Sequence, residues 1–590
     1  DKAIDLAKGA HTVERIALKP DAVGQIAYDV RVRGPDGIDV SRRLTIDVKP
    51  PAGDIKRTTI AKLKPNGGTL TLSKDLVADL IASRTRINVT AGPQARFDVP
   101  GLLTQLDRYP YGCAEQTVSR ALPLVYANAV ASSIGLGTDK ALKERVQKAI
   151  DHVMSMQDAS GAFGIWGPQS ADLWLTAYVT DFLTRTKESG FAIPDRAYTN
   201  AVDRLQNFIS YAQDFDKGGE DRAYALYVLA RNGRAPIGEL RYYADTRLDR
   251  FATPLAKAQI GAALAMLGDK ERAEKAFKAA IADIEGNASA DPARDDFGSR
   301  LRDSAALVTL ASETGIVKGD ATRLVDVIAK ATASRTYTST QEQAWMLLAA
   351  NALSGDAAAT KLRFGGAPVQ GPLLRPLTPA EISKDGGLVI ANDGDAAVDV
   401  VVSVIGSALT PEPAVSKGFT ITRSFFTLDG KEVQLASASG GKATLAQNDR
   451  LVAVVKVESK EAGGRVLVVD RLPSGLEIEN PRLVTSGDVK TLGWLDGTVT
   501  AEHAEFRDDR FVAAFNLFAK KSANGNGEGE GDSDSQHGST EAKSTATAAY
   551  IVRAVTPGTF VHPAATVEDM YRPERYARTS AGTLTITGKE

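Results

Sequence analysis

The spacing of hydrophobic and polar positions changes twice along the chain. Residues 24–50 alternate apolar and polar side chains on both sides of a Pro-Asp-Gly turn at positions 35–37. That pattern predicts a β-hairpin. A second strand-like stretch covers residues 67–93, so the first hundred residues are predicted to be rich in strands.

From about residue 100 to 353 the apolar positions recur at helical spacing, interrupted by Gly, Pro and Asn. Helices are predicted at 141–156, 173–186, 196–211, 221–231 and 256–267. Helices of this length joined by short turns predict consecutive antiparallel hairpins. Alternation returns at 386–406, 418–428 and 450–459, which predicts further strands.

Residues 520–546 are polar and rich in Gly and Ser. They cannot bury apolar surface, so a disordered loop is predicted there. Strand patterning resumes at 546–560, which indicates that the loop interrupts a β domain.

Size and charge narrow the classes of function. A chain of 590 residues predicts about three to five domains. Its net charge of −2 suggests neither nucleic acid nor an anionic membrane as a partner. It has one cysteine, so no intrachain disulfide is expected, and no apolar run reaches the roughly 20 residues of a membrane span. The polar start at Asp1 resembles no signal peptide, so an export signal is expected upstream.

The one cysteine lies where extended residues 109–112 meet a helical pattern. Gln116 follows Cys113 by three residues, which places both side chains on one helix face. Loss of ammonia would then join the sulfur to the Gln116 acyl carbon as an internal thioester. A helix N-terminus stabilises the thiolate that leaves when this bond opens. The alternative is a small buried hydrophobic residue.

The residues around Cys113 resemble the signature of the α2-macroglobulin and complement thioester family, Pro-Tyr-Gly-Cys-x-Glu-Gln, here at 110–116. Three further blocks, 160–183, 217–230 and 336–353, are similar to the same family and follow in its order. The strand-like segments 466–484, 505–515 and 550–574 look like the C-terminal domain of bacterial members. The chain is therefore identified as the C-terminal part of a bacterial α2-macroglobulin.

The resemblance implies a multidomain fold, all-β plus all-α. Residues 1–49 would end a macroglobulin-like β domain. Residues 50–99 and 357–412 would form two halves of a CUB-like β-sandwich. The thioester domain, an α/α-toroid at 100–356, would be inserted between these halves. Residues 413–590 would form a C-terminal macroglobulin-like domain that contains the disordered loop.

The resemblance also implies a function: a broad-spectrum protease inhibitor in bacterial envelope defence. After cleavage of an upstream bait, the thioester would bind lysine amines of the attacking protease. This chemistry acts once, so the protein is expected not to be an enzyme. A periplasmic inner-membrane lipoprotein is implied, monomeric, with a peptidoglycan synthase as a partner. No metal-binding or nucleotide-binding motif is present, so no metal or other cofactor is implied.

Some complement members carry a His, in the loop before the Gly-Gly-Glu-Asp segment, that assists transfer to hydroxyls. The corresponding loop here, 210–219, has Gln213 or Asp214 in that region and no His. The five histidines are His11, His152, His503, His537 and His562. Amine targets are therefore expected over hydroxyls, and His152 is expected to be an ordinary helix residue.

Two tyrosines are expected to shield the thioester from water. Tyr109 lies four residues before Cys113, and a Tyr ring can cover a bond while its hydroxyl binds a polar partner. Tyr571 matches an aromatic residue that packs against the thioester in bacterial members. Ordinary half-buried packing is the alternative for both.

The sequence also allows two alternatives to a protease inhibitor: an enzyme of the α/α-toroid type and a surface adhesion protein. An α/α-toroid cyclase needs an Asp-x-Asp-Asp motif, but the helical region offers only Arg294-Asp295-Asp296. A glycosidase carboxylate pair is compatible with the sequence, yet it leaves the thioester motif unexplained. A surface adhesion protein would share the thioester chemistry and differ only in its target.

Overall fold

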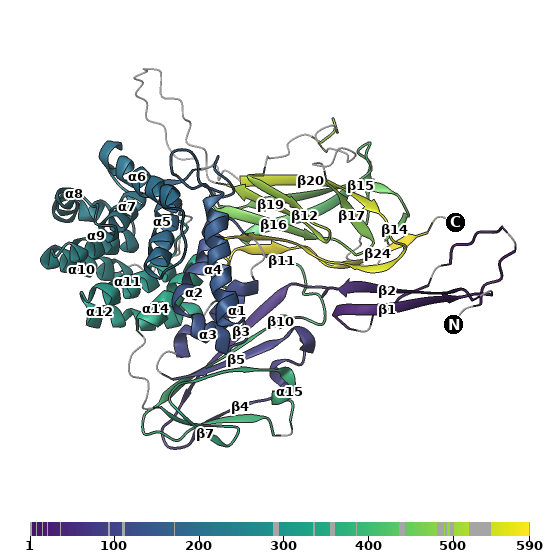
Figure 1. Ribbon diagram of the computed structural model, residues 1–590, viewed down its shortest axis with the longest axis horizontal. Helices are drawn as coiled ribbons and strands as arrows, with labels where there is room; N and C mark the ends of the chain where they lie inside the picture. The colour runs from purple at the N-terminus through teal and green to yellow at the C-terminus, as the bar shows by residue number, and fades with distance from the viewer. Residues whose placement is uncertain are drawn as a thin grey trace.

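The computed structural model describes residues 3–7, 9–14, 16–20, 22–35, 37–92, 95–108, 112–169, 171–286, 294–333, 335, 337–353, 360–384, 386–435, 443–461, 463–480, 489, 492–495, 501–517 and 544–588. A helical domain, a β-sandwich, a large C-terminal β domain and an N-terminal ribbon lie beside one another (Figure 1). The predicted combination of all-α and all-β domains is confirmed.

The N-terminal ribbon is the predicted hairpin. Strands β1 (Gly24–Arg33) and β2 (Asp39–Val48) pair antiparallel, with Tyr28 opposite Leu44. Within the described residues no other strand joins this two-stranded sheet. Apolar side chains such as Val32 and Val40 are exposed on it. The ribbon extends away from the helical domain, beneath the C-terminal β domain in the view of Figure 1.

Strands from both sides of the helical region form one sandwich. One sheet has the order β3-β10-β5-β8, and the other β4-β9-β6-β7. The bounds are β3 (Asp54–Leu63), β4 (Gly68–Leu72), β5 (Arg86–Ala91), β6 (Lys361–Phe364), β7 (Ala367–Gln370), β8 (Leu373–Leu377), β9 (Leu388–Asn392) and β10 (Val398–Ser407). Val402 pairs with Thr59 on one side and Val89 on the other. The helical region is thus an insertion into this sandwich, while the CUB-like name and the boundaries stay predictions.

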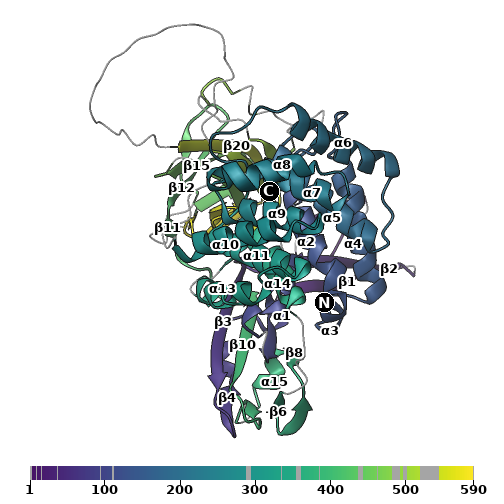
Figure 2. The same ribbon diagram turned by 90° about the vertical axis from the view of Figure 1, so that its left-hand side faces the viewer.

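Six helices of the described chain form a closed inner ring, each packed on the next and the last on the first (Figure 2). They are α2 (Ala114–Tyr126), α5 (Leu173–Glu188), α7 (Glu220–Arg231), α9 (Pro254–Met266), α11 (Arg300–Thr314) and α14 (Thr340–Ala352). Outside them lie α1 (Val99–Arg108), α3 (Asn128–Ser133), α4 (Asp139–Met154), α6 (Asp195–Tyr211), α8 (Ile237–Tyr242), α10 (Lys270–Gly286), α12 (Lys318–Thr322) and α13 (Leu324–Ala333).

The two layers differ in burial as their sequences require. Outer helix α6 buries one stripe, whereas inner helix α7 is buried from Arg222 to Ala230. A helix apolar on one stripe covers a core, and a helix buried all round lies within it. The five predicted helices agree with α4, α5, α6, α7 and α9 to within two residues at each end, the usual uncertainty of helix ends.

In the part of the C-terminal β domain that the structure describes, the strands form three sheets, with the orders β11-β23-β22-β16-β19-β18, β13-β12-β15-β20-β17 and β14-β24-β21. The bounds are β11 (Val415–Lys417), β12 (Phe419–Phe426), β13 (Glu432–Val433), β14 (Ala443–Ala446), β15 (Arg450–Ser459), β16 (Arg465–Arg471), β17 (Leu476–Glu479), β18 (His503–Phe506), β19 (Arg510–Asn516), β20 (Ser544–Ala554), β21 (Gly558–His562), β22 (Ala565–Asp569), β23 (Tyr576–Arg578) and β24 (Gly582–Thr587).

One part of the loop prediction is wrong. Residues 544–546 begin strand β20, with Ser544 opposite Ser459. Backbone pairing with β15 carries the strand into polar sequence, because the ladder of hydrogen bonds does not need apolar side chains. Residues 520–543 of the predicted loop lie outside the described residues.

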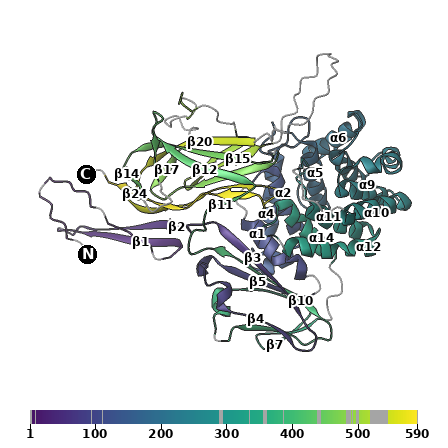
Figure 3. The same cartoon turned by 180° about the vertical axis from the view of Figure 1, so that it is seen from behind.

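The C-terminal β domain docks on the helical ring. Its residues Leu467, Val469, Met570 and Tyr571 belong to the same buried cluster as the core of the ring. Figure 3 shows this contact from behind, with the β domain against the end of the ring that carries the start of α2. Two domains that share one apolar core separate only when that surface is exposed to water.

Candidate functional site

Cys113 caps the N-terminus of α2, with an extended backbone at φ −65° and ψ 165°. Its Sγ accepts the backbone N–H of Gln116 at 3.5 Å. In return, the Gln116 side-chain oxygen accepts the backbone N–H of Cys113 at 3.4 Å. This is the reciprocal geometry of a capping box, with a sulfur where a hydroxyl is usual. The structure therefore brings the two predicted side chains together over the first turn.

Both side chains are withdrawn from water. Cys113 is 0% exposed and Gln116 is 1% exposed. The neighbouring backbone is held on two sides: the N–H of Ala114 donates to the Ile165 carbonyl at 2.8 Å, and His152 Nε2 lies 3.1 Å from the Gly112 carbonyl. His152 is an exposed residue of α4, as expected, yet it contacts the residue before the cysteine. Tyr109 lies outside the described residues.

Glu115 lies between the two and is also fully buried. Its carboxylate accepts hydrogen bonds from Ser119, from Thr340 at 3.0 Å to each oxygen, and from the Gln341 amide at 2.9 Å. A further bond comes from the C-terminal β domain, where the Tyr571 hydroxyl donates to Oε2 at 2.8 Å. The carboxylate thus joins α2, α14 and the β domain at one point.

Aromatic rings surround Tyr571 at this point. Its ring packs edge-on against Phe297, with centroids 5.0 Å apart, and Phe297 packs against Trp174 at 5.3 Å. Trp174 in turn contacts Tyr178 and Tyr224. Tyr571 therefore occupies a space between the Glu115 carboxylate, which its hydroxyl contacts, and the ring of Phe297, which in turn contacts Trp174. We call this the aromatic recess.

The guanidinium group of Arg465, from the β domain, lies in the same recess. The Arg465 guanidinium carbon lies 4.8 Å from the centroid of the Phe297 ring, within cation–π range. The Arg465 side chain is only 10% exposed, and its charge faces Glu502 at 3.7 Å. Its Nε and Nη1 have no hydrogen-bond partner among the described residues. Tyr571 and Arg465 are thus two β-domain side chains in one recess of the helical domain.

Burial dominates the titration of this site. It raises the pKa of the Cys113 thiol far above its usual range, and the nearby Glu115 carboxylate raises it further. Burial also raises the pKa of Glu115, against the opposing effect of its hydrogen-bond donors. The pKa of Tyr571 is raised by burial and by the charges of Glu115 and Cys113. The Glu115 charge therefore acts on both Cys113 and Tyr571, which places the three buried groups close together.

Two parts of the chain match known family models. Residues 418–525 and 532–574 match the bacterial alpha-2-macroglobulin MG10 domain, and residues 87–216 match the A-macroglobulin TED domain. The chain belongs to the bacterial α2-macroglobulin family. The helical ring is accordingly called the TED domain below, and the C-terminal β domain the MG10 domain.

Relatives support this assignment along the whole chain. The alpha-2-macroglobulin of Xylella fastidiosa (strain Temecula1) is 30% identical over 599 residues, which cover 94% of this chain and 34% of that protein. The alpha-2-macroglobulin of Escherichia coli K12 is 28% identical over 617 residues, covering 99% and 35%. The chain thus spans about a third of the length of these curated relatives.

Solved structures show the same arrangement of domains. Native Escherichia coli alpha-2-macroglobulin, from domain MG7 to its C-terminus, gives a TM-score of 0.78 at 25% identity, covering 95% of this chain and 87% of that one. Salmonella alpha-2-macroglobulin reacted with methylamine gives 0.79 at 26% identity, covering 96% and 36%.

Sequence reasoning missed several residues of the site. Glu115 was visible as a motif position, but its partners Thr340, Gln341 and Tyr571 come from distant parts of the chain. Trp166 of the TED domain stacks on His503 of the MG10 domain, with centroids 4.3 Å apart and planes 2° from parallel. No sequence motif signals that pair.

Asp214, one of the two candidates for the position of the complement His, is engaged elsewhere. Its carboxylate accepts hydrogen bonds from the hydroxyls of Tyr242 and Tyr243 and forms an ion pair with Arg247. These contacts hold Asp214 against the segment around α8. The structure gives it no contact with Cys113 or Gln116.

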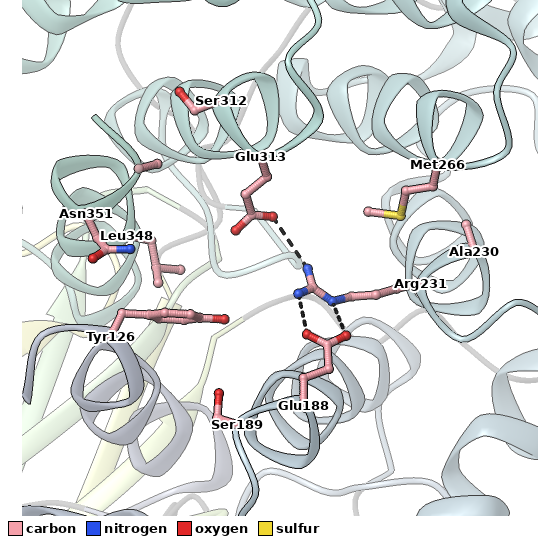
Figure 4. Close-up of a pocket in the computed structure, with 11 residues that line it drawn as sticks. Tyr126, Glu188, Ser189, Ala230, Arg231, Met266, Ser312, Glu313, Leu348 and Asn351 are labelled. Atoms are coloured by element: carbon pink, nitrogen blue, oxygen red, sulfur yellow. Dashed lines mark hydrogen bonds and ion pairs between the residues drawn. The ribbon is translucent and has the colours of Figure 1, made fainter. Parts of the chain in front are cut away.

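A cavity of about 740 Å³ lies at the other end of the ring, where the C-terminal ends of the six inner helices converge. Figure 4 shows Arg231 reaching across it to Glu188 and Glu313. Tyr126, Met266 and Asn351 also line it. Because the charges pair with one another, we assign no ligand to this cavity.

Two kinds of feature are absent from the described residues. They contain no helix long and apolar enough to cross a membrane. They also contain no group of three His, Cys, Asp or Glu residues that could hold a metal ion.

Proposed function

We propose that Cys113 and Gln116 form an internal thioester in the mature protein. The observation that carries this proposal is their reciprocal capping geometry inside a dry first helical turn. Sγ attacks the side-chain carbonyl carbon of Gln116, a C–S bond forms, the C–N bond breaks, and ammonia leaves. A thiolate at a helix N-terminus is stabilised by the helix dipole, which favours both closure and later opening.

The docked MG10 domain protects this bond. Water is excluded because Tyr571 fills the aromatic recess, and the buried surroundings disfavour a leaving thiolate by raising the Cys113 pKa. If the MG10 domain undocked from the TED domain, both water and a nucleophile would reach the thioester. Tyr109 is proposed as the second shield, on the sequence alone.

The whole protein is proposed to be a protease inhibitor. Bait cleavage outside this chain would release the MG10 domain, and a lysine amine of the attacking protease would then take the Gln116 acyl group. The reaction acts once, so the protein is not classed as an enzyme. The Salmonella relative has been reacted with methylamine, which agrees with an amine as the nucleophile. A periplasmic lipoprotein acting as a monomer, with a peptidoglycan synthase as partner, belongs to the same proposal.

Incubating the full-length protein with trypsin and elastase tests the proposal. We expect protease bands shifted to high mass under denaturing conditions, joined to Gln116 through a protease lysine as mapped by peptide mass spectrometry. The Cys113→Ser variant serves as the control and should give no adduct. Adducts with surface glycans in the absence of any protease would instead support the adhesion function.

A further inference from the structure

We infer that the aromatic recess is the binding site for the incoming lysine side chain, and that Glu115 accepts its proton. This inference rests on the proposed thioester. In the closed structure the recess is occupied by Tyr571 and Arg465, both of which leave with the MG10 domain. What remains is the Glu115 carboxylate with aromatic rings around it, close enough to the proposed thioester for its charge to act on Cys113.

The two departing side chains indicate what the recess accepts. Tyr571 is a slender side chain that ends in a hydrogen-bond donor, and this donor meets Glu115. Arg465 places a cation over the face of Phe297. A lysine combines both properties: a narrow apolar stem and a cationic donor at its tip. Aromatic faces attract such a cation, and a carboxylate forms a charge-assisted hydrogen bond with it.

The backbone conformation of Phe297 supports the same inference. This residue has φ of 54°, in the left-handed region that bulky side chains rarely adopt. It is 1% exposed and lies between Trp174, Tyr571 and Arg465. Strained residues persist where the surroundings hold them, and they gather at functional sites. Here the strain presents an aromatic ring to the recess.

The chemistry balances as follows. The lysine enters as an ammonium ion and gives one proton to the Glu115 carboxylate. The free amine attacks the Gln116 acyl carbon, so a C–N bond forms and the C–S bond breaks. The second amine proton goes to the Cys113 thiolate, which leaves as a thiol. Glu115 later returns its proton to solvent. A carboxylate that takes a proton from the ammonium ion in this step acts as a general base.

This inference accounts for the absence of a loop histidine. A cation-attracting recess selects ammonium groups over neutral hydroxyls before any chemistry occurs. Specificity for amines then comes from binding, and the base that a lysine needs is already in the thioester motif. Asp214 is held by Tyr242, Tyr243 and Arg247 and is not required.

The test uses the 590-residue chain with Tyr571→Ala, which removes the side chain that covers Glu115, with or without Glu115→Gln. Thiol release is followed with butylamine, which is cationic near pH 7.5, and with hydroxylamine, which is uncharged there. Loss of Glu115 should slow butylamine by about tenfold or more, as expected for a lost general base. Hydroxylamine is already uncharged and needs no proton removed before it attacks, so its rate should change by less than about twofold.

Phe297→Leu provides a second variant, because Glu115→Gln alters a buried network. It should raise the butylamine concentration that gives half-maximal rate by a larger factor than it changes the hydroxylamine rate. Equal effects on both nucleophiles, or no effect on either, would overturn the inference. Failure of the thioester itself is recognised separately: the unmutated chain would then lack the mass loss of one ammonia.

Discussion

The hydroxyl of Tyr571 donates a 2.8 Å hydrogen bond to Oε2 of Glu115, across the boundary between the MG10 and TED domains. Both residues are buried, Tyr571 at 6% and Glu115 at 0% exposure. Glu115 follows the proposed thioester cysteine by two residues. One bond thereby links the position of the MG10 domain to the chemistry of the first turn of α2.

The first prediction separates the hydroxyl of Tyr571 from its ring. Tyr571→Phe keeps the ring against Phe297 but leaves a buried carboxylate oxygen short of a donor, which costs about 1–3 kcal/mol. We expect methylamine to release the Cys113 thiol roughly tenfold faster than in the unmutated chain. Tyr571→Ala should be faster still. Tyr211→Ala, at a tyrosine that is 84% exposed, is the matched control and should have no effect.

The second prediction concerns the bond itself. The intact mass of freshly purified chain should be lighter than its sequence by one ammonia, and methylamine should restore a titratable thiol. Cys113→Ser should show neither property. A thiol that reacts fully in untreated native protein, with no mass deficit, would contradict the thioester.

The third prediction concerns the stacked rings of Trp166 and His503, which join the two domains beside the site. A stacked aromatic pair contributes about 0.5–1.5 kcal/mol beyond its buried area. Trp166→Ala should therefore weaken docking and raise the methylamine rate by a few fold. If His503→Ala and the double variant give the same rate as Trp166→Ala, the effect belongs to the pair. Additive effects would assign it to each ring separately.

The local part of the site was predictable from sequence, and the distant part was not. Cys113 and Gln116 are three residues apart in a helical pattern, so helix geometry alone places them together. Thr340 and Gln341 reach Glu115 only because α14 closes the ring against α2. Ring closure depends on packing among six helices, which no local pattern encodes. Tyr571 was found through its resemblance to bacterial members, not through spacing.

In the fold, too, the local elements were predictable from sequence and the pairing of distant segments was not. Helical ranges were predicted to within two residues because amphipathic and fully apolar patterns are local signals. Pairing of β3 with β10 joins segments more than 300 residues apart and was available only through family resemblance. Arg465 was not anticipated, because a charged residue at the start of a strand is usually a solvated position.

The last prediction concerns the acid stability of the MG10 domain. His562 is 0% exposed, and neither ring nitrogen has a hydrogen-bond partner among the described residues. Burial, with a contribution from the Arg423 charge, holds its pKa well below the usual value. His562 therefore binds a proton near pH 6.5 in the unfolded chain, whereas in the folded domain it stays neutral at that pH. Stability from this residue is present above that pH and is lost as the pH falls.

The expected loss is about 1.4 kcal/mol for each pH unit below roughly 6, until the pKa of folded His562 is reached. Chemical denaturation of the chain between about pH 7.5 and 5, monitored by tryptophan fluorescence, measures it. His562→Phe keeps the ring against Phe425 and removes the titrating group, so the variant should lose less stability over this range. The difference between the two proteins isolates His562 from buried carboxylates such as Glu115. Their raised pKa values give a contribution of the opposite sign. Parallel pH profiles would mean that folded His562 binds its proton as readily as the unfolded chain does, which would contradict a lowered pKa.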